Sequence, residues 1–235
     1  MFARSVVESR PGDRALKVDL LRKVPLLEGL TEEELETLAD VTQIRKFPKN
    51  CMVILADEQG DSFFVIDSGK AKVSVTAADG REVILSVLGP GEFFGDMSLL
   101  DDHPRSANVT TMETSDLLVI RRSDFLDALQ SHPSIAIKLM VTLAQRLRSA
   151  DRQTANFALL GITDRICSVL LSVAEEQGTE TEEGIIIPKR PTHQVLASMA
   201  GTARETITRV LSRLESEGYI RSRGRELIIM KRIRE

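Results

Sequence analysis

Cysteine is scarce in this sequence, and long hydrophobic runs are absent. Cys51 and Cys167 are the only cysteines among 235 residues, too few for a disulfide framework or a four-cysteine metal site. Scarce cysteine is typical of the reducing cytoplasm. No run of about 18 uncharged apolar residues occurs, which argues against a transmembrane helix. Residues 1–30 are charged throughout and contain no apolar segment typical of a secretory signal. We therefore expect a cytoplasmic protein without a membrane partner.

Motifs of common enzyme classes are also missing. We find no nucleophile elbow, no cluster of metal-ligating residues and no Walker loop. The three histidines, His103, His132 and His193, stand far apart in sequence and have no obvious partners, so we expect each of them on the surface or in a loop. An enzyme is therefore the weaker hypothesis, and we expect no catalytic residue and no metal site.

Charge is unevenly distributed along the chain. The sequence has 31 Lys and Arg against 35 Asp and Glu, a net charge of −4. Residues 192–235 hold nine basic and five acidic side chains, a net of +4, so the rest of the chain carries −8. A basic end on an acidic body indicates a separate module that binds a polyanion. Ordinary variation of charge along a chain is the alternative.

The hydrophobic pattern changes character along the chain. Residues 1–42 are expected to be helical, because Thr31 and Glu34 form a capping box ahead of an apolar helical pattern. Residues 43–121 instead alternate short β-rich runs with turn residues, the pattern of an antiparallel sandwich or barrel. Within them, Asp79-Gly80 predicts a tight hairpin. The expected strands are residues 52–55, 63–67, 71–76, 83–87 and 117–120.

A long helix is expected from Pro133 to about residue 160, since proline favours the first turn of a helix. It would be roughly 37 Å long, too long for one small β domain to cover, and its apolar residues follow a coiled-coil heptad that favours a homodimer interface. Packing on its own domain is the alternative. The seam residues are Met140, Leu143, Leu147, Ala150, Thr154 and Phe157. The chain therefore divides into an N-terminal domain (1–132), a dimerisation helix (133–160) and a basic C-terminal module (161–235).

Residues 89–109 contain side chains suited to binding a phosphate. Gly95 permits a tight turn whose backbone N–H groups can hold an anion, and Arg105 offers a planar fork of donors. Ser106 adds a hydroxyl donor, and Asp96 is an acceptor suited to a sugar hydroxyl. Residues 97–100 could form one helical turn whose amides face the same anion. A glycine-rich surface loop with scattered charges is the alternative.

Residues 192–217 are typical of two helices joined by a turn. Thr192 can cap the first helix and Gly201 can supply the left-handed turn residue. The second helix would then expose one polar face near its N-terminus, the end that a recognition helix inserts into the major groove. Arginine pairs with guanine and glutamate accepts from cytosine. That face holds Arg204, Glu205, Thr208 and Arg209. A helical hairpin with a solvated face is the alternative.

Both segments resemble known motifs. Phe94-Gly95, Leu99 and Pro104-Arg105-Ser106-Ala107 resemble the phosphate-binding cassette of cyclic-nucleotide-binding domains. Residues 201–211 resemble the recognition helix of the cyclic-AMP receptor protein / fumarate–nitrate regulator (Crp/Fnr) family of bacterial transcription factors. The resemblance implies an α+β fold with an N-terminal antiparallel β-roll of the cyclic-nucleotide-binding type, a long dimerisation helix and a C-terminal winged helix-turn-helix. Residues 1–132 would then be the sensor domain and residues 161–235 the DNA-binding domain.

The resemblance also implies a ligand site. Arg146 on the long helix would pair with Asp96, which stands where the family usually has Glu. Ala150 and Asp151 replace the Thr-Ser pair that contacts the base, and Asp151 could accept from an exocyclic amine. The implied ligand is a cyclic nucleotide or a similar small anion: cyclic AMP first, with cyclic GMP and cyclic di-GMP as alternatives. The implied ligand-binding residues are Gly95, Asp96, Met97, Ser98, Arg105, Ser106, Arg146 and Asp151.

On the DNA side, the resemblance implies base contacts by Arg204, Glu205 and Arg209 and phosphate contacts by Thr192 and Thr206. Thr208 would lie beside a neighbouring base, and Arg223 would contact the DNA backbone from the wing. The implied function is a dimeric, ligand-gated transcription regulator that binds a palindromic operator in double-stranded DNA, with RNA polymerase as a further candidate partner. A ligand-independent, haem-sensing or redox-sensing regulator of the same family is the alternative. A cyclic-nucleotide subunit of a kinase or channel fits the basic C-terminal module less well.

Overall fold

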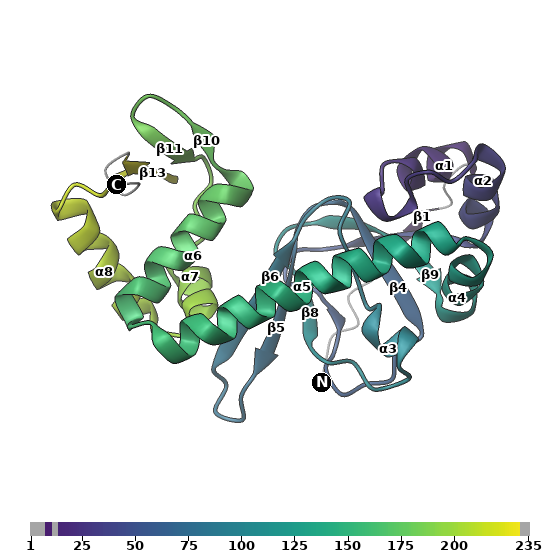
Figure 1. Ribbon diagram of the computed structural model, residues 1–235, viewed down its shortest axis with the longest axis horizontal. Coiled ribbons are helices and arrows are strands. Elements are labelled where there is room, and N and C mark those ends of the chain that lie inside the picture. The colour runs from purple at the N-terminus through teal and green to yellow at the C-terminus, as the bar shows by residue number, and fades with distance from the viewer. Residues whose placement is uncertain (1–7, 11–13, 231–235) are drawn as a thin grey trace. The chain divides into compact units, whose positions relative to one another are not determined.

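The computed structural model describes residues 8–10 and 14–230 and shows an α+β protein (Figure 1). The chain forms two compact units, and the division falls between Arg148 and Ser149 within the long helix α5 (Pro133–Leu159). The hairpin tip Thr76–Ile84 is grouped with the second unit. Over the described residues, no helix has both the length and the apolar character that crossing a bilayer requires.

The described part of residues 1–42 is mostly helical, as expected, while residues 1–7 and 11–13 of this prediction lie outside the described residues. It contains α1 (Arg14–Arg22), the short helix η1 (Pro25–Leu27) and α2 (Glu32–Val41). The predicted capping box is confirmed, because Thr31 Oγ1 accepts from the Glu34 amide while the Thr31 amide donates to the Glu34 carboxylate at 2.6 Å. One part of the prediction is wrong: Glu8–Arg10 is a strand, β1, since its backbone pairs with the edge of the next strand along the chain.

Two antiparallel sheets form the β-roll of the first unit. Their strand orders are β1-β2-β9-β4-β7 and β3-β8-β5-β6. The five predicted strands and the hairpin at Asp79-Gly80 are confirmed. The strands β2, β7 and β8 were not predicted, because they are short or polar. The strands after β1 are β2 (Gln43–Phe47), β3 (Met52–Ile54), β4 (Ser62–Ser68), β5 (Ala71–Thr76), β6 (Glu82–Leu88), β7 (Phe93–Phe94), β8 (Asn108–Thr111) and β9 (Ser115–Arg121).

Strands β4 and β9 are buried on both faces. Phe64 and Val119 point into a core that also contains residues of the second sheet, such as Val109. Val65 and Leu118 belong instead to the core shared with the helices. Alternate residues of one strand therefore serve two hydrophobic cores. Figure 1 shows α1, α2 and α4 (Arg122–Ser131) near the first turns of α5, beside this sheet.

Helix α5 begins at Pro133, as predicted, and has two distinct faces. Ile135 and Leu139 are buried, and the partly buried Leu143 packs with them against the core of its own domain. Helical periodicity places Leu143 with Leu139, and its part in an intersubunit seam stays a prediction. On the other face, apolar side chains are exposed. They are Ile137, Met140, Val141 and Leu147.

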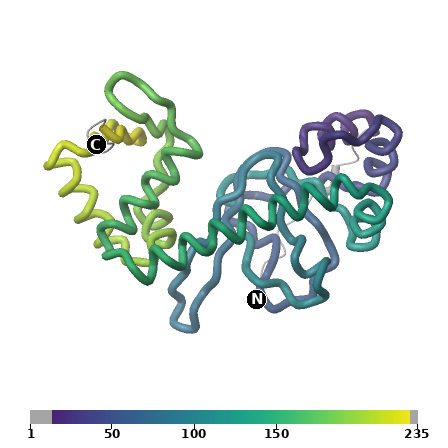
Figure 2. The backbone as a smooth tube through the Cα atoms, viewed as in Figure 1, coloured from purple at the N-terminus to yellow at the C-terminus, as the bar shows by residue number. Residues whose placement is uncertain are grey.

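Between the end of α5 and residue 230, the second unit forms three helices and an antiparallel sheet of order β10-β11-β13-β12. Its core includes Ile166, Leu196, Ile207 and Leu227. Its path in Figure 2 runs from the green α6 to the yellow C-terminal elements, and the final hairpin β12–β13 completes a winged helix-turn-helix. The elements are α6 (Ile162–Gln177), β10 (Thr179–Glu180), β11 (Gly184–Ile187), α7 (His193–Ala200), α8 (Arg204–Ser216), β12 (Ile220–Arg223) and β13 (Glu226–Met230).

Candidate functional site

The phosphate-binding candidate begins where β7 ends. Gly95 follows Phe94 and has a φ of +83°, a conformation that side-chain-bearing residues rarely adopt. A Cβ atom at this position would also lie 2.8 Å from Arg105 Nη1. The predicted helical turn follows as α3 (Met97–Leu100). A glycine is therefore required here both by the turn and by the close approach of the arginine.

Arg105 is buried, with only 7% of its surface exposed. Its Nη1 donates to the Gly95 carbonyl at 2.6 Å and to Ser98 Oγ at 2.8 Å, and its Nη2 donates to the Ser62 carbonyl at 2.7 Å. All three partners are neutral. Burial lowers the pKa of Arg105, while Asp61 and Asp96 oppose that shift, and an arginine keeps its charge regardless. The cassette thus contains a buried cation whose direct partners carry no charge.

The guanidinium of Arg105 lies against the backbone of Gly60. A Cβ at Gly60 would overlap the Arg105 guanidinium and Ser98 Oγ. No local pattern in the sequence marks this contact, because the two residues are far apart in the chain. The contact holds Arg105 from one side, so the direction of its remaining donors is fixed by packing as well as by hydrogen bonds.

Asp96 is the second charged group of the cassette and is 2% exposed. Its Oδ1 accepts from Arg146 Nη1 at 3.2 Å, as the resemblance implied. Arg146 also donates to the Phe93 carbonyl at 2.5 Å and lies 4.4 Å from the centre of the Phe93 ring. Asp96 Oδ2 is buried and has no hydrogen-bond partner among the described residues. A buried carboxylate oxygen without a donor is costly, so this atom is suited to a hydroxyl donor from a ligand.

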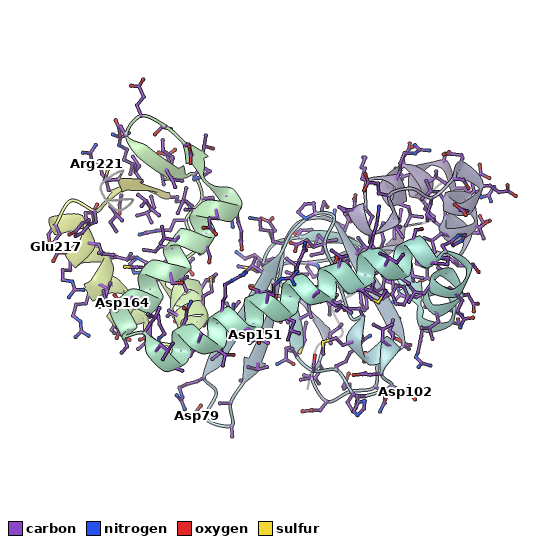
Figure 3. The ribbon with its side chains drawn as sticks, viewed as in Figure 1. Asp79, Asp102, Asp151, Asp164, Glu217 and Arg221 are labelled. Atoms are coloured by element: carbon purple, nitrogen blue, oxygen red, sulfur yellow. The ribbon has the colours of Figure 1, made fainter. Side chains whose placement is uncertain are left out.

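The other predicted ligand residues differ in their surroundings. Ser98 is buried beside Arg105. Ser106 and Met97 are exposed and face each other, with 3.7 Å between Ser106 Oγ and Met97 Sδ. Asp151 is exposed on α5 and belongs to the second unit (Figure 3), so its role in the cassette stays a prediction. Among the described residues, no group of three or more His, Cys, Asp and Glu side chains is arranged to hold a metal ion.

The DNA-reading candidate is built by α7 and α8. Thr192 caps α7 by accepting from the Val195 amide at 3.3 Å. Gly201 ends this helix in the left-handed conformation. Helix α8 then buries one apolar face, which fixes which residues face outward. Its buried residues are Ile207, Val210, Leu211 and Leu214.

The outward face of α8 is the face that the sequence predicted. Arg204, Glu205 and Arg209 are exposed there, and none of their side chains forms a hydrogen bond or ion pair with another described residue. Thr208 is also exposed, and Thr206 is half-buried. Two arginines and a glutamate without internal partners form a surface that can hydrogen-bond the edges of bases.

His103 is exposed in a loop, as expected, whereas His132 and His193 are half-buried at helix ends, where each has a polar partner. His193 Nδ1 lies 2.9 Å from Thr208 Oγ1, and His132 Nδ1 lies 2.9 Å from Glu34 Oε1. Neither contact has a signal in the sequence, because each joins two helices whose crossing the sequence does not define.

The wing carries basic residues that already have an acidic neighbour. Arg223 Nη2 lies 3.4 Å and Arg221 Nη1 lies 3.7 Å from Glu183 Oε2 (Arg221 is labelled in Figure 3). All three side chains are about half exposed. Glu183 lies in the short loop between β10 and β11. DNA phosphates would have to compete with this carboxylate for both arginines.

Known proteins match both halves of the chain. Residues 44–132 match the family profile of the cyclic nucleotide-binding domain, and residues 164–234 match that of the Crp-like helix-turn-helix domain. The chain is 36% identical over 197 residues to the cyclic AMP receptor protein of Thermus thermophilus, covering 84% of this chain and 88% of that protein. It is 28% identical over 211 residues to the CRP-like cAMP-activated global transcriptional regulator of Mycobacterium tuberculosis, covering 90% and 94%.

Solved structures show the same architecture. The structure of the c-di-GMP responsive global regulator CLP of Xanthomonas campestris matches with a TM-score of 0.74 at 25% identity, covering 85% of this chain and 99% of that chain. The related proteins are transcription regulators rather than enzymes. With its cyclic-nucleotide-binding domain and its DNA-binding helix-turn-helix domain, the chain belongs to the Crp/Fnr family of bacterial transcription regulators.

Proposed function

We propose that this regulator is a homodimer that binds a palindromic DNA site when a cyclic nucleotide, first of all cyclic AMP, occupies the cassette. The observation that carries the ligand proposal is the orphaned Oδ2 of Asp96 close to the buried cation of Arg105. A 3′,5′-cyclic nucleotide has one phosphate charge and one free sugar hydroxyl, the 2′-hydroxyl. These two groups match the two unmet requirements of the cassette.

Arg105 has donors to spare for the phosphate. A guanidinium has five N–H donors, and three are used by Gly95, Ser98 and Ser62. The other two are available for phosphate oxygens, and Ser106 and Met97 would lie at the exposed rim. Asp96 Oδ2 would accept from the sugar hydroxyl. Asp151 would contact the base.

Cyclic AMP is the first candidate because the Thermus and Mycobacterium relatives are named for it. Cyclic di-GMP is an alternative because the Xanthomonas regulator responds to it. Cyclic GMP shares the phosphate and the sugar hydroxyl, so the cassette contacts alone do not separate it from cyclic AMP. The side chains that meet the base would make that distinction.

The exposed apolar face of α5 supports a homodimer. Ile137, Met140 and Leu147 are each more than half exposed although they are large and hydrophobic. Their spacing of three and seven residues is that of a helix seam. A second copy of α5 would bury this stripe, while Ile135 and Leu139 keep the helix on its own β-roll. In this proposal residues 1–132 are the sensor, residues 133–160 the dimerisation helix and residues 161–235 the DNA-binding domain.

The two recognition helices would insert into successive major grooves about 34 Å apart. Arg204, Glu205 and Arg209 would contact base edges, and Thr208 would lie beside a neighbouring base. Phosphates would be held by Thr192, Thr206 and Arg223. Binding of a ligand between Arg105 and Arg146 would favour the dimer arrangement that fits DNA, by as much as its affinity differs between the two states. RNA polymerase is a candidate further partner, and the cytoplasm is the proposed location.

Calorimetry of the purified protein with cyclic AMP, cyclic GMP and cyclic di-GMP tests the ligand proposal. We expect saturable binding of cyclic AMP by the wild type. Arg105→Gln should weaken it at least about 100-fold, since two charge-assisted hydrogen bonds contribute about 1.5–3 kcal/mol each. Arg121→Gln removes an exposed arginine of the same domain and serves as the control. Equal affinity in wild type and Arg105→Gln would show that the pocket is assigned wrongly. Binding of none of the three nucleotides would favour a ligand-independent or haem-sensing regulator.

A further inference from the structure

His193 lies beside the proposed DNA-reading face of α8. It is the first residue of α7, directly after the cap residue Thr192. Its ring reaches across the turn to α8, where Nδ1 lies 2.9 Å from Thr208 Oγ1. Thr208 lies one helical turn after Arg204 on the exposed face of α8. The histidine therefore joins the start of one helix to the middle of the surface that reads the bases.

The contact between His193 and Thr208 can form in either charge state of the imidazole. Thr208 Oγ1 lies 2.9 Å from His193 Nδ1 and 3.2 Å from the Arg204 carbonyl, so its single hydroxyl hydrogen can be donated to either acceptor. When the hydroxyl donates to the Arg204 carbonyl, it accepts from a protonated Nδ1. An imidazolium carries a hydrogen on both ring nitrogens, so it forms the contact in this second arrangement, with Nδ1 donating to Thr208. The Thr208 hydroxyl can therefore hold the charged ring in place.

The charges facing His193 in the free protein are positive. Burial is the largest cause that lowers the pKa of His193, and Arg190 and Arg204 lower it further. Arg190 approaches from the segment between β11 and α7, and Arg204 from the first turn of α8. No carboxylate of the described residues contributes to the shift. DNA phosphates at this face would raise the pKa of His193, because each phosphate attracts the imidazolium and offsets the positive charge of the two arginines.

We propose that His193 is a positioning residue of the recognition helix that takes up a proton when DNA binds, so that DNA affinity rises as the pH falls. This inference rests on the proposed DNA-binding mode. By linkage, the binding constant changes with pH only between the pKa of the free protein and the higher pKa of the complex. Each unit of difference between those two values gives up to about tenfold in affinity for each recognition helix.

The test uses the full chain and a fluorescent duplex recovered by in vitro selection with the wild type in the presence of cyclic AMP. Dissociation constants are measured by anisotropy at pH 6.0 and pH 8.0 at constant ionic strength. We expect the wild type to bind more tightly at pH 6.0, about 3- to 10-fold for each recognition helix. His193→Asn keeps a donor near the Nδ1 position but cannot titrate, and its affinity should not vary with pH. Thr208→Val removes the acceptor and should reduce the pH dependence.

The sequence has three histidines, which allows an independent readout. His103→Gln alters an exposed histidine of the other unit and should keep the wild-type pH profile. The NMR titration of the His193 ring should give a higher pKa in the complex than in the free protein. A wild type that binds DNA equally at both pH values, or a His193→Asn variant that keeps the wild-type pH profile, overturns the inference. A wild type that selects no duplex contradicts the proposed function itself.

Discussion

Replacement of Asp96 by asparagine tests the ligand chemistry most sharply. The substitution removes the charge of a carboxylate that is 2% exposed and keeps its size. We expect the bond from a ribose hydroxyl to Oδ2 to be charge-assisted and desolvated. Such hydrogen bonds contribute about 1.5–3 kcal/mol, so Asp96→Asn should raise the Kd for cyclic AMP by about 10- to 150-fold.

A second ligand isolates the same hydrogen bond. Cyclic 2′-deoxy-AMP lacks the hydroxyl that Asp96 would accept from, and the wild type should bind it more weakly than cyclic AMP by a similar factor. Asp96→Asn should bind the two ligands nearly equally, because the variant has already lost the interaction. Isothermal titration calorimetry measures all four combinations. Asp127→Asn removes an exposed carboxylate of the same unit and serves as the control.

The reasoning is refuted by an Asp96→Asn variant that discriminates between the two ligands as strongly as the wild type does. Asp96 Oδ1 also accepts from Arg146 at 3.2 Å, so Asp96→Asn changes that ion pair as well. The two ligands separate this effect from the loss of the hydrogen bond to the ligand. Loss of this ion pair would lower the affinity for both ligands alike, whereas loss of the hydrogen bond to Oδ2 would lower the affinity only for the ligand that has the hydroxyl.

Three further predictions concern other contacts. Gly60→Ala places a Cβ on the Arg105 guanidinium, so it should lower both cyclic AMP affinity and the thermal unfolding temperature; an unchanged affinity would contradict the packing. Glu183→Gln frees Arg221 and Arg223 and should raise DNA affinity by about 0.2–1 kcal/mol per ion pair with a steeper salt dependence, whereas the neighbouring Glu182→Gln should not. Backbone and hydroxyl hydrogen bonds from Thr31 lower the pKa of Glu34. The ionised Glu34 carboxylate should therefore stabilise the fold fully at a pH above the ordinary pKa of glutamate. This stabilisation should be lost as the pH falls through the lowered pKa of Glu34. Thermal melts should show a weaker acid dependence for Glu34→Gln.

Local signals predicted the elements that depend on neighbouring residues. The capping box at Thr31, the hairpin at Asp79-Gly80 and the helix start at Pro133 are each set within a few residues of chain, and each is confirmed. Strand β7 has only two residues and exists because it pairs with β4. No local pattern marks such a strand, since its stability comes from the neighbouring sheet.

In the candidate site, too, contacts between sequence neighbours could be predicted, whereas most contacts between distant residues could not. The cassette residues were found because they lie together in sequence, and the Asp96–Arg146 pair was found only through the family resemblance, since it spans 50 residues. The contact of Gly60 with Arg105 and that of His193 with Thr208 were missed. Both depend on how separate elements pack, and neither a single glycine in a turn nor a single histidine at the start of a helix forms a periodic pattern. The hydrophobic pattern also did not distinguish the two faces of α5, because apolar residues occur on both faces.

Ligand gating of DNA binding is the central claim, and one titration addresses it directly. The selected operator duplex is titrated with the full-length wild type, without nucleotide and with saturating cyclic AMP, at fixed pH and salt. We predict binding at least tenfold tighter with the nucleotide, as one dimer per palindrome. Equal affinity with and without cyclic AMP, cyclic GMP or cyclic di-GMP would contradict it.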